Sequence, residues 1–235
     1  MRVLVVTAVP VERDAVTRAF GGTPETVALP GTELHRLGAF DVLAGGAGPA
    51  AAAAATAFAL ASASAQYGLV VSAGIGGAFT PLTPLGSLVV ASDIVAADLG
   101  ADTPDGFLPV TALGFGRDRF APPPALVRAV AAAAGAAPGP VLTVSTVTGT
   151  AERAGSLLAA HPGALAEAME GSGVAEAAAR TEVPVLELRA VSNAVGPRDR
   201  DAWRIGDALA ALTEAFGKTA PVLEGWNRHD DRHRS

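Results

Sequence analysis

Short, nearly continuous runs of Val, Leu and Ala recur along the chain and alternate with longer segments of helical character. Runs of this length and composition are typical of strands that are buried on both faces of a parallel sheet. They lie at residues 2–6, 40–44, 69–72, 87–90, 141–145 and 185–191. Helical candidates fill the intervals, at residues 11–20, 50–66, 124–134, 151–159 and 202–217. This alternation predicts an α/β fold with a mostly parallel sheet covered by helices on both faces.

The last predicted helix has the clearest apolar face, because Ile205, Leu209, Leu212 and Phe216 recur at helical spacing. It is expected to pack as an outer layer. From residue 219 onward the apolar period is lost and polar residues dominate. We therefore assign residues 1–218 to one domain and expect residues 219–235 to form a disordered polar tail, with its histidines in solvent rather than on a metal.

Composition narrows the class of protein. A chain of 235 residues without a change in composition fits a single domain. The formal net charge of -6, without a Lys/Arg cluster within the fold, argues against nucleic acid as a partner, since such proteins need a basic face. The absence of Cys excludes disulfides, thiolate metal sites and a Cys nucleophile.

No residue from 42 to 92 is charged, which raises the question of a membrane span. Gly and Pro punctuate this stretch, and its middle is Ala and Ser, which are too weakly apolar to favour lipid strongly. A buried helix between buried strands explains it better, so no membrane partner is expected. Charged residues follow the apolar residues 3–6 too soon for an export signal, which makes the cytoplasm the expected location.

Ligands in such sheets bind where strands end, and four segments of the chain carry candidate chemistry. Residues 7–14 place Glu12 in the first turn of a helix, where the helix dipole favours a carboxylate. Residues 72–79 read as a Gly-rich turn, and residues 168–177 place Met169 and Glu170 before small residues that open a helix. Residues 187–196 end a strand in Ser192 and Asn193, whose amide is both donor and acceptor. Each has a structural alternative: a helix-terminal charge, a tight turn or a helix cap.

Two other candidate sites are set aside. Residues 46–51 loosely fit a dinucleotide-binding motif, but the next strand ends without the acidic residue that would hold a ribose. The loop with Asp98, Asp102 and Asp105 has the composition of a cation site, yet three carboxylates without fixed geometry favour a solvated loop.

In this order, the four segments resemble the nucleoside phosphorylase and hydrolase superfamily, which includes methylthioadenosine/adenosylhomocysteine nucleosidase and purine nucleoside phosphorylase. The similarity runs from about residue 1 to residue 218 and is most specific at residues 8–12, 74–77, 168–170 and 189–193. The resemblance implies a three-layer αβα fold with a twisted, mixed, mostly parallel sheet. The first thirty residues lack the phosphate loop of the phosphorylases, and Glu12 stands where the nucleosidases keep their water-activating glutamate. Hydrolysis is therefore favoured over phosphorolysis.

Asn193 stands where the adenine-directed nucleosidases place an Asp. An aspartic acid can protonate N7 of the purine, whereas an amide can accept from a protonated N7 and donate to a 6-oxo group. Asn193 therefore fits hypoxanthine better than adenine. Together with residues 72–79, which have Ile75 where the adenine-directed enzymes have a Ser, it resembles the futalosine hydrolase family, which releases hypoxanthine from futalosine in a menaquinone pathway.

The resemblance also implies a set of site residues. Glu12 and Asn193 are expected to be catalytic, as general base and as stabiliser of the departing base. Substrate binding is expected from Gly74, Ile75, Gly76, Phe79, Met169, Glu170 and Arg189. No metal or organic cofactor is expected, the partner is a small-molecule nucleoside, and the chain is expected to form a homodimer.

Three rival functions remain open: an adenine-directed nucleosidase, a purine nucleoside phosphorylase and a nucleoside-binding protein without catalysis. The presence of both Glu12 and Glu170 speaks against the last, since binding alone needs no positioned base. No sequence feature names the group that binds the distal carboxylate of futalosine.

Overall fold

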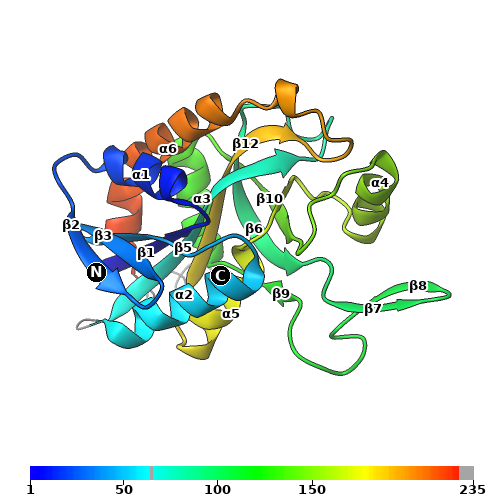
Figure 1. Cartoon of the computed structure of the whole chain (residues 1–235), viewed down its shortest axis with the longest axis horizontal. Coiled ribbons are helices and arrows are strands. Elements are labelled where there is room, and N and C mark those ends of the chain that lie inside the picture. Colours follow the sequence, from blue (N-terminus) through cyan, green and yellow to red (C-terminus); the bar gives the residue numbers. More distant parts are fainter. Residues whose placement is uncertain (64–65, 228–235) are drawn as a thin grey trace.

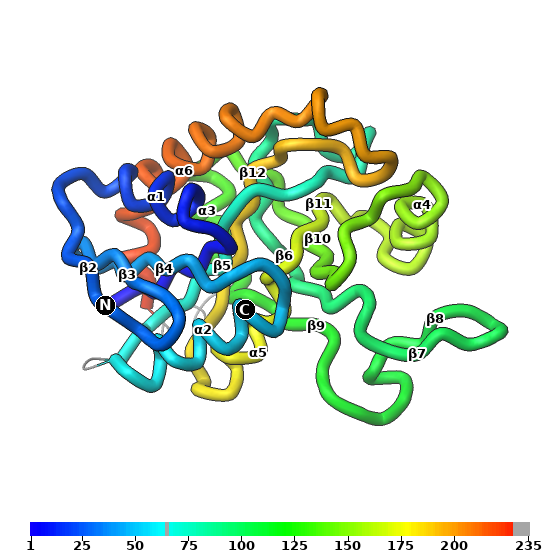
Figure 2. Tube along the Cα trace, viewed as in Figure 1, coloured from blue at the N-terminus to red at the C-terminus, as the bar shows by residue number. Residues whose placement is uncertain are grey.

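The computed structural model describes residues 1–63 and 66–227, in which helices cover both faces of a central sheet (Figures 1 and 2). The helices are α1 (Pro10–Ala19), α2 (Pro49–Ser62), α3 (Pro124–Ala134), α4 (Ala151–Ala160), α5 (Gly171–Arg180) and α6 (Ile205–Gly225), with a short 3-10 helix at Arg200–Ala202. The strands are β1 (Arg2–Thr7), β2 (Glu25–Leu29), β3 (Thr32–Leu37), β4 (Phe40–Ala44), β5 (Tyr67–Ala78), β6 (Leu88–Ala96), β7 (Gly100–Thr103), β8 (Gly106–Pro109), β9 (Arg119–Phe120), β10 (Ala137–Thr143), β11 (Ala166–Ala168) and β12 (Val185–Ala194).

The main sheet is mixed, with the order β11-β10-β6-β12-β5-β1-β4-β3-β2. Parallel pairing joins β4, β1, β5 and β12, and also β6, β10 and β11. The short strand β11 pairs with β10 on one side and with β5 on the other, so five strands close into a ring at this end of the sheet. This closure brings the ends of β5, β11 and β12 together.

Two hydrophobic cores lie on opposite faces of the sheet, and β1 contributes to both. Val3 and Val5 belong to the core under α1, α3 and α6, and Leu4 and Val6 belong to the core under α2 and α5. Alternating side chains of a strand point to opposite faces, so a strand that is apolar at every position must be covered on both. The predicted three-layer α/β fold is confirmed.

Several strands of the structure are longer than the apolar runs that predict them, and the difference in length is largest for β5. The apolar run predicts a strand that ends at Ser72 and a Gly-rich turn over residues 72–79, and this prediction is wrong, because β5 continues to Ala78. Residues 74–77 pair with β12. Glycines weaken strands in isolation, but within a sheet they allow close approach of neighbouring side chains.

The boundary predicted at residue 219 is also wrong, because α6 continues to Gly225. Leu223 is 1% exposed and Trp226 is 8% exposed, so this part of the chain packs into the core under α1, α3 and α6. Pro221 lies inside the helix and removes one backbone donor, and the burial of apolar side chains beyond it keeps the helix intact. Residues 228–235, with His229 and His233, lie outside the described residues.

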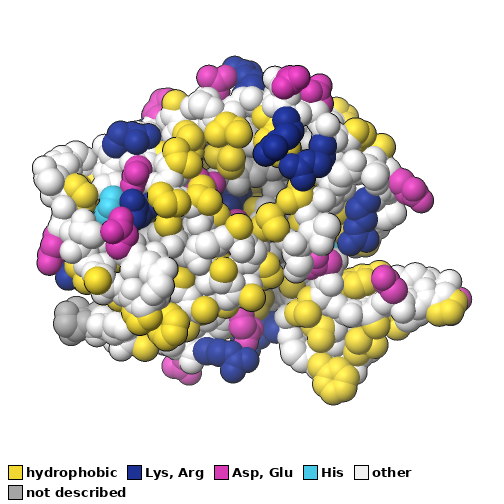
Figure 3. Space-filling model, viewed as in Figure 1, with side chains coloured by type: hydrophobic (Ala, Val, Ile, Leu, Met, Phe, Trp, Pro, Cys, Tyr) yellow, Lys and Arg dark blue, Asp and Glu magenta, His cyan; other side chains and the backbone are white. Residues whose placement is uncertain are grey.

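The pattern did not predict two antiparallel hairpins, β2–β3 and β7–β8. The β7–β8 hairpin belongs to an arm that projects from the body (Figure 1), and hydrophobic side chains gather on this arm (Figure 3). No helix among residues 1–63 and 66–227 combines the length and the apolar character needed to cross a membrane.

Candidate active site

A cavity of about 250 Å³ opens where β1, β5, β11 and β12 end. The side chains of Glu12 and Asn193, predicted from distant parts of the sequence, both line it. The full lining is Ala8, Val9, Glu12, Ala47, Ile75, Gly76, Gly77, Val147, Thr148, Glu167, Ala168, Met169, Glu170, Ser192, Asn193, Val195 and Trp203. The cavity therefore joins most of the predicted site residues with others that the sequence reading did not name.

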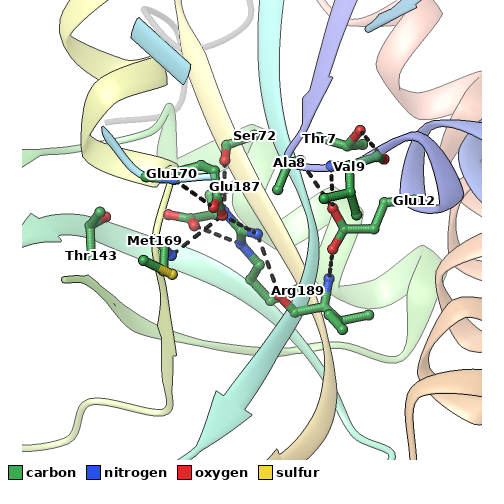
Figure 4. A network of polar contacts seen from close by, with 12 residues as sticks. Thr7, Ala8, Val9, Glu12, Ser72, Thr143, Met169, Glu170, Glu187 and Arg189 are labelled. Atoms are coloured by element: carbon green, nitrogen blue, oxygen red, sulfur yellow. Dashed lines mark hydrogen bonds and ion pairs between the residues drawn. The ribbon is translucent and has the colours of Figure 1, made fainter. Parts of the chain in front are cut away.

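Glu12 lies in the first turn of α1, where the helix leaves β1. Its Oε2 accepts hydrogen bonds from the backbone N–H of Ala8 at 3.0 Å and of Val9 at 3.3 Å, and its Oε1 accepts from the N–H of Ile75 at 2.9 Å (Figure 4). Only 3% of the residue is exposed. Burial raises the pKa of the Glu12 carboxyl above its ordinary value, opposed by the hydrogen bond from Ile75 and by the charge of Arg189. The result is a fixed carboxylate that is a stronger base than an exposed glutamate.

Arg189 is fully buried beneath the cavity and holds two other carboxylates (Figure 4). Its Nη1 lies 3.1 Å from Glu170 Oε2, and its Nε donates to Glu187 Oε1 at 2.9 Å. Its Nη2 donates to Ser72 Oγ at 3.0 Å. Arg189 does not line the cavity, so the structure makes it a positioning residue for Glu170 rather than a residue in contact with substrate.

Glu170 lines the cavity at the N-terminus of α5. Besides its ion pair with Arg189, it accepts hydrogen bonds from the backbone N–H of Gly48 and of Met169, each at 3.3 Å. A helix N-terminus and an arginine together stabilise the negative charge of this carboxylate. Glu170 is 4% exposed, so its charge acts on the cavity with little screening by solvent.

Glu187 was not predicted as a site residue, although it is fully buried behind Arg189. Its Oε2 has no hydrogen-bond partner among the described residues and lies against Gly171, where any side chain would collide with the carboxylate. Burial raises the pKa of Glu187, and the nearby Arg189 opposes this rise. Glu187 thus binds Arg189, and Arg189 in turn holds Glu170 in position.

Asn193 reaches the cavity because β12 carries a bulge at its end. The register with β5 shifts between Val191 and Asn193, which leaves Ser192 as an extra residue, and both Ser192 and Asn193 line the cavity. The Ser192 hydroxyl donates to Asn193 Oδ1 at 2.8 Å, and Asn193 Nδ2 donates to the backbone oxygen of Ala194 at 2.9 Å. One amide hydrogen and one lone pair of Oδ1 remain for a ligand.

The glycines of β5 provide space for these groups. A Cβ at Gly74 would lie 2.6 Å from Glu12 Oε1 and 2.8 Å from Arg189 Nη1, so Gly74 makes room for the carboxylate without lining the cavity itself. Gly76, Ile75 and Met169 do line it.

Phe79 does not line this cavity. It is 1% exposed and packs with Val95, Leu142 and Leu157 in a separate apolar cluster near α4. β5 ends at Ala78, and Phe79 follows it into the core, so its expected role in substrate binding is corrected to one in packing.

Two features of the cavity were missed by the sequence reading. One is the buried pair of Glu167 and Thr148, which come from β11 and from the loop before α4. The other is Trp203, whose ring lies 5.4 Å from Arg198 Cζ and 5.7 Å from Arg200 Cζ. Glu167 lies three residues before the predicted Glu170, but β11 is too short to show a period that would mark it.

Known proteins that resemble this chain identify its family. A family model described as the phosphorylase superfamily matches residues 2–223. The futalosine hydrolase of Streptomyces coelicolor is 67% identical over 234 residues, which cover 98% of this chain and 100% of that protein. The chain belongs to the phosphorylase superfamily, and within it to the futalosine hydrolase family.

A second member of the futalosine hydrolase family, from Acidothermus cellulolyticus, is 46% identical over 218 residues, or 91% of this chain and 88% of that protein. Among solved structures, the 5′-methylthioadenosine/S-adenosylhomocysteine nucleosidase of Neisseria meningitidis in complex with methylthio-immucillin-A has a TM-score of 0.80. It shares 21% identity and covers 94% of this chain and 99% of its own. This likeness shows that the fold is shared with the nucleosidases.

Proposed function

We propose that this protein hydrolyses the N-glycosidic bond of futalosine, releasing hypoxanthine and dehypoxanthine futalosine. The observation that carries the proposal is that Glu12 and Asn193 line one cavity together with Glu170. The cavity thus offers a base, an anionic group and an amide around a space in which a nucleoside can bind. Membership in the futalosine hydrolase family supports this substrate over other nucleosides.

In the proposed mechanism, the C1′–N9 bond breaks toward a ribosyl oxocarbenium ion, and its electrons pass to the base. Glu12 removes a proton from a water molecule as the water oxygen bonds to C1′. Three backbone N–H groups hold the carboxylate in one orientation, which supports this role because a general base must be aligned with the proton it removes.

Glu170 would bind the ribose hydroxyls and place its negative charge near the developing cation. Because Arg189 and two backbone N–H groups fix this carboxylate before substrate arrives, little reorganisation is needed during the reaction. Met169 would pack against the sugar and the base. The mechanism requires no metal or organic cofactor.

Asn193 would stabilise the departing hypoxanthine, which takes up a proton from solvent water at N7. Its Oδ1 would accept from N7–H, and its free amide hydrogen would donate to the 6-oxo group. The Ser192 hydroxyl donates a hydrogen bond to Asn193 Oδ1 and so supports this orientation of the amide. In a base with a 6-amino group, this amino group would face the amide hydrogen of Asn193, although the amino group itself donates and needs an acceptor.

Two arginines beside the cavity support an assignment for the distal carboxylate of futalosine. Trp203 lines the cavity, and the guanidinium groups of Arg198 and Arg200 lie over its ring. No carboxylate of the described residues forms an ion pair with either arginine. We assign Trp203 to the aromatic part of the futalosine side chain and the two arginines to its carboxylate.

Replacing both arginines tests this assignment. We expect Arg198→Gln combined with Arg200→Gln to raise the KM for futalosine by roughly three- to tenfold, since ion pairs of exposed side chains contribute modestly. The KM for inosine, which lacks the distal carboxylate, should stay the same. Arg128→Gln, a change of the same kind at an exposed residue of α3, is the control. An equal rise in KM for both nucleosides would remove the arginines from carboxylate binding.

The rival functions are separated by one panel of substrates. Futalosine, methylthioadenosine and inosine are incubated with the enzyme in phosphate-free buffer and again with phosphate, and the free bases are quantified by chromatography. The proposal predicts hypoxanthine from futalosine at the same rate in both buffers. A kcat/KM for adenine release from methylthioadenosine that exceeds the kcat/KM for futalosine would favour the adenine nucleosidase. Release of a base only in the presence of phosphate would favour the phosphorylase.

We further propose that the protein acts as a homodimer in the cytoplasm.

A further inference from the structure

Glu167 is a buried carboxylate that the mechanism above does not use. It lies on β11, is 5% exposed and lines the same cavity as Glu12 and Asn193. Its Oε1 accepts from the backbone N–H of Thr148 at 3.0 Å, and its Oε2 accepts from the Thr148 hydroxyl at 2.5 Å. No cationic side chain of the described residues forms an ion pair with it. A buried carboxylate held only by neutral donors usually has a further partner.

The sheet register places Glu167 next to the amide that reads the base. Gly77 of β5 pairs with Glu167 of β11 on one side and with Asn193 of β12 on the other. Residues paired in this way project from the same face of a sheet, and two strand spacings separate them by roughly 10 Å. Gly77 between them has no side chain, and Val195 Cγ2 and Asn193 Nδ2 occupy the space beside it, so a planar base would contact Glu167 and Asn193 across the cavity that both residues line.

Each oxygen of Glu167 retains acceptor capacity after the hydrogen bonds from Thr148. Burial raises the pKa of the Glu167 carboxyl, and both hydrogen bonds from Thr148 and the charge of Arg153 oppose that rise by favouring the ionised form. An ionised carboxylate in this position can accept a hydrogen bond from an N–H group of the ligand.

Hypoxanthine and adenine differ at two neighbouring positions of the six-membered ring. At C6, hypoxanthine has an oxo group and adenine an amino group. At N1, hypoxanthine carries a hydrogen and donates, whereas adenine has a lone pair and accepts. The oxo group lies between N7 and N1, so a site that contacts N7 and the oxo group with one residue needs a second residue, an acceptor, to read N1.

We infer that Glu167 is this second specificity residue: its carboxylate accepts the N1–H of the 6-oxopurine and rejects adenine, whose N1 would bring a lone pair against a buried negative charge. The inference rests on the proposed function, because it assigns the base recognised at that same site. Thr148 then positions Glu167 through its hydroxyl and its backbone N–H. Specificity arises from two residues on opposite sides of Gly77, with Asn193 on the N7 side and Glu167 on the N1 side.

The first test compares two substrates that differ only in the base, futalosine and its 6-amino counterpart. In the Glu167→Gln variant, the new amide group can donate to N1 of adenine. We therefore expect the ratio of kcat/KM for the 6-oxo over the 6-amino substrate to fall at least about tenfold, as a hydrogen bond to a charged group is lost. Glu152→Gln, at an exposed residue of α4, should leave the ratio unchanged. If Glu167→Gln lowers both rates equally, Glu167 only supports Thr148 and the inference is wrong.

A second test needs neither the variant nor catalysis. Dissociation constants of the unaltered protein for hypoxanthine and 1-methylhypoxanthine are measured by calorimetry. Loss of the N1–H should weaken binding at least about tenfold. Equal affinities would overturn the assignment of Glu167, whereas a failure of the protein to cleave futalosine would overturn the proposed function and leave this comparison of free bases readable.

Discussion

Two features of Glu12, its burial and its hydrogen bonds from backbone N–H groups, have opposite effects on the pKa of its carboxyl. Three backbone N–H groups favour its ionised form, while desolvation favours its neutral form and dominates, so the pKa is raised. A general base works best when its pKa approaches the operating pH. The local structure thus fits a group that removes a proton from water near neutral pH.

This predicts both the activity and the pH dependence of a Glu12 variant. Glu12→Gln keeps the size of the side chain but replaces one accepting oxygen with an NH₂ group that cannot act as a base, so it should bind nucleoside and turn over at least roughly a hundredfold slower. In the unaltered enzyme, kcat should fall as the pH drops through the pKa of Glu12, at a pH higher than an exposed glutamate would give, because only the ionised form accepts a proton. A pH–rate profile of both proteins checks this. An acid limb that persists unchanged in Glu12→Gln would assign it to another group.

Asn193 sets the second prediction at this scale. Asn193→Asp replaces the amide donor with an acid that can protonate N7 and accept from a 6-amino group. We expect this variant to lose hydrolysis of futalosine and to gain measurable activity on its 6-amino counterpart. Steady-state rates on both substrates provide the readout, and an unchanged base preference would contradict the account of Asn193.

The sequence reading reached some residues of the site and missed others for physical reasons. Glu12 and Asn193 stand out as polar residues where apolar strands end, Glu170 is identified by the family resemblance, and all three line one cavity. The sequence pattern does not identify Glu167 and Glu187 as site residues. Each carboxylate is stabilised in the interior by another side chain, Thr148 for Glu167 and Arg189 for Glu187, and these contacts form only in the folded chain. No local pattern distinguishes such a residue from a solvated one.

At the scale of elements, β5 and β12 build the site by two deviations from regular strands. Glycines in β5 leave space for Glu12 and Arg189, and a bulge in β12 turns Ser192 and Asn193 into the cavity. The sequence pattern predicts the start of β12 correctly and the start of β5 two residues late, and both predicted strands end before the observed ones. The far ends of these strands are fixed by pairing with neighbours that are distant in sequence, which a local pattern does not contain.

Gly74 offers a direct test of this arrangement. Because a Cβ at residue 74 would lie 2.6 Å from Glu12 Oε1, Gly74→Ala should displace the carboxylate and lower kcat roughly tenfold or more. Gly155→Ala in α4 is the matched control, since an added Cβ there meets no atom within 4 Å and alanine favours helix. A Gly74→Ala enzyme with unchanged kcat would show that Glu12 does not depend on the space at this glycine.

At the scale of the whole molecule, the projecting arm of β7 and β8 is the least embedded part of the chain (Figure 1). Leu99, Leu108, Leu113 and Phe115 on this arm are between 38% and 68% exposed. Exposed apolar side chains gathered in one place are typical of interfaces in soluble proteins. We propose that these side chains form the interface of the expected homodimer.

The arm leads to a prediction about assembly. Light scattering after size-exclusion chromatography should give twice the mass of one chain for the unaltered protein. A variant with Leu108→Asp and Phe115→Asp should give the mass of one chain, with an unchanged circular dichroism spectrum as evidence of folding, since charges in an apolar interface oppose association. A monomeric unaltered protein, or a dimeric variant, would contradict the assignment of this surface.

The central claim is that water, activated by Glu12, attacks the sugar of a hypoxanthine nucleoside. Its most direct test is incubation of the enzyme with futalosine in phosphate-free water enriched in oxygen-18, with mass spectrometry of both products. The account predicts free hypoxanthine and one heavy oxygen atom on the released sugar. Absence of hypoxanthine, or its release only when phosphate is added together with formation of a sugar phosphate, would contradict it.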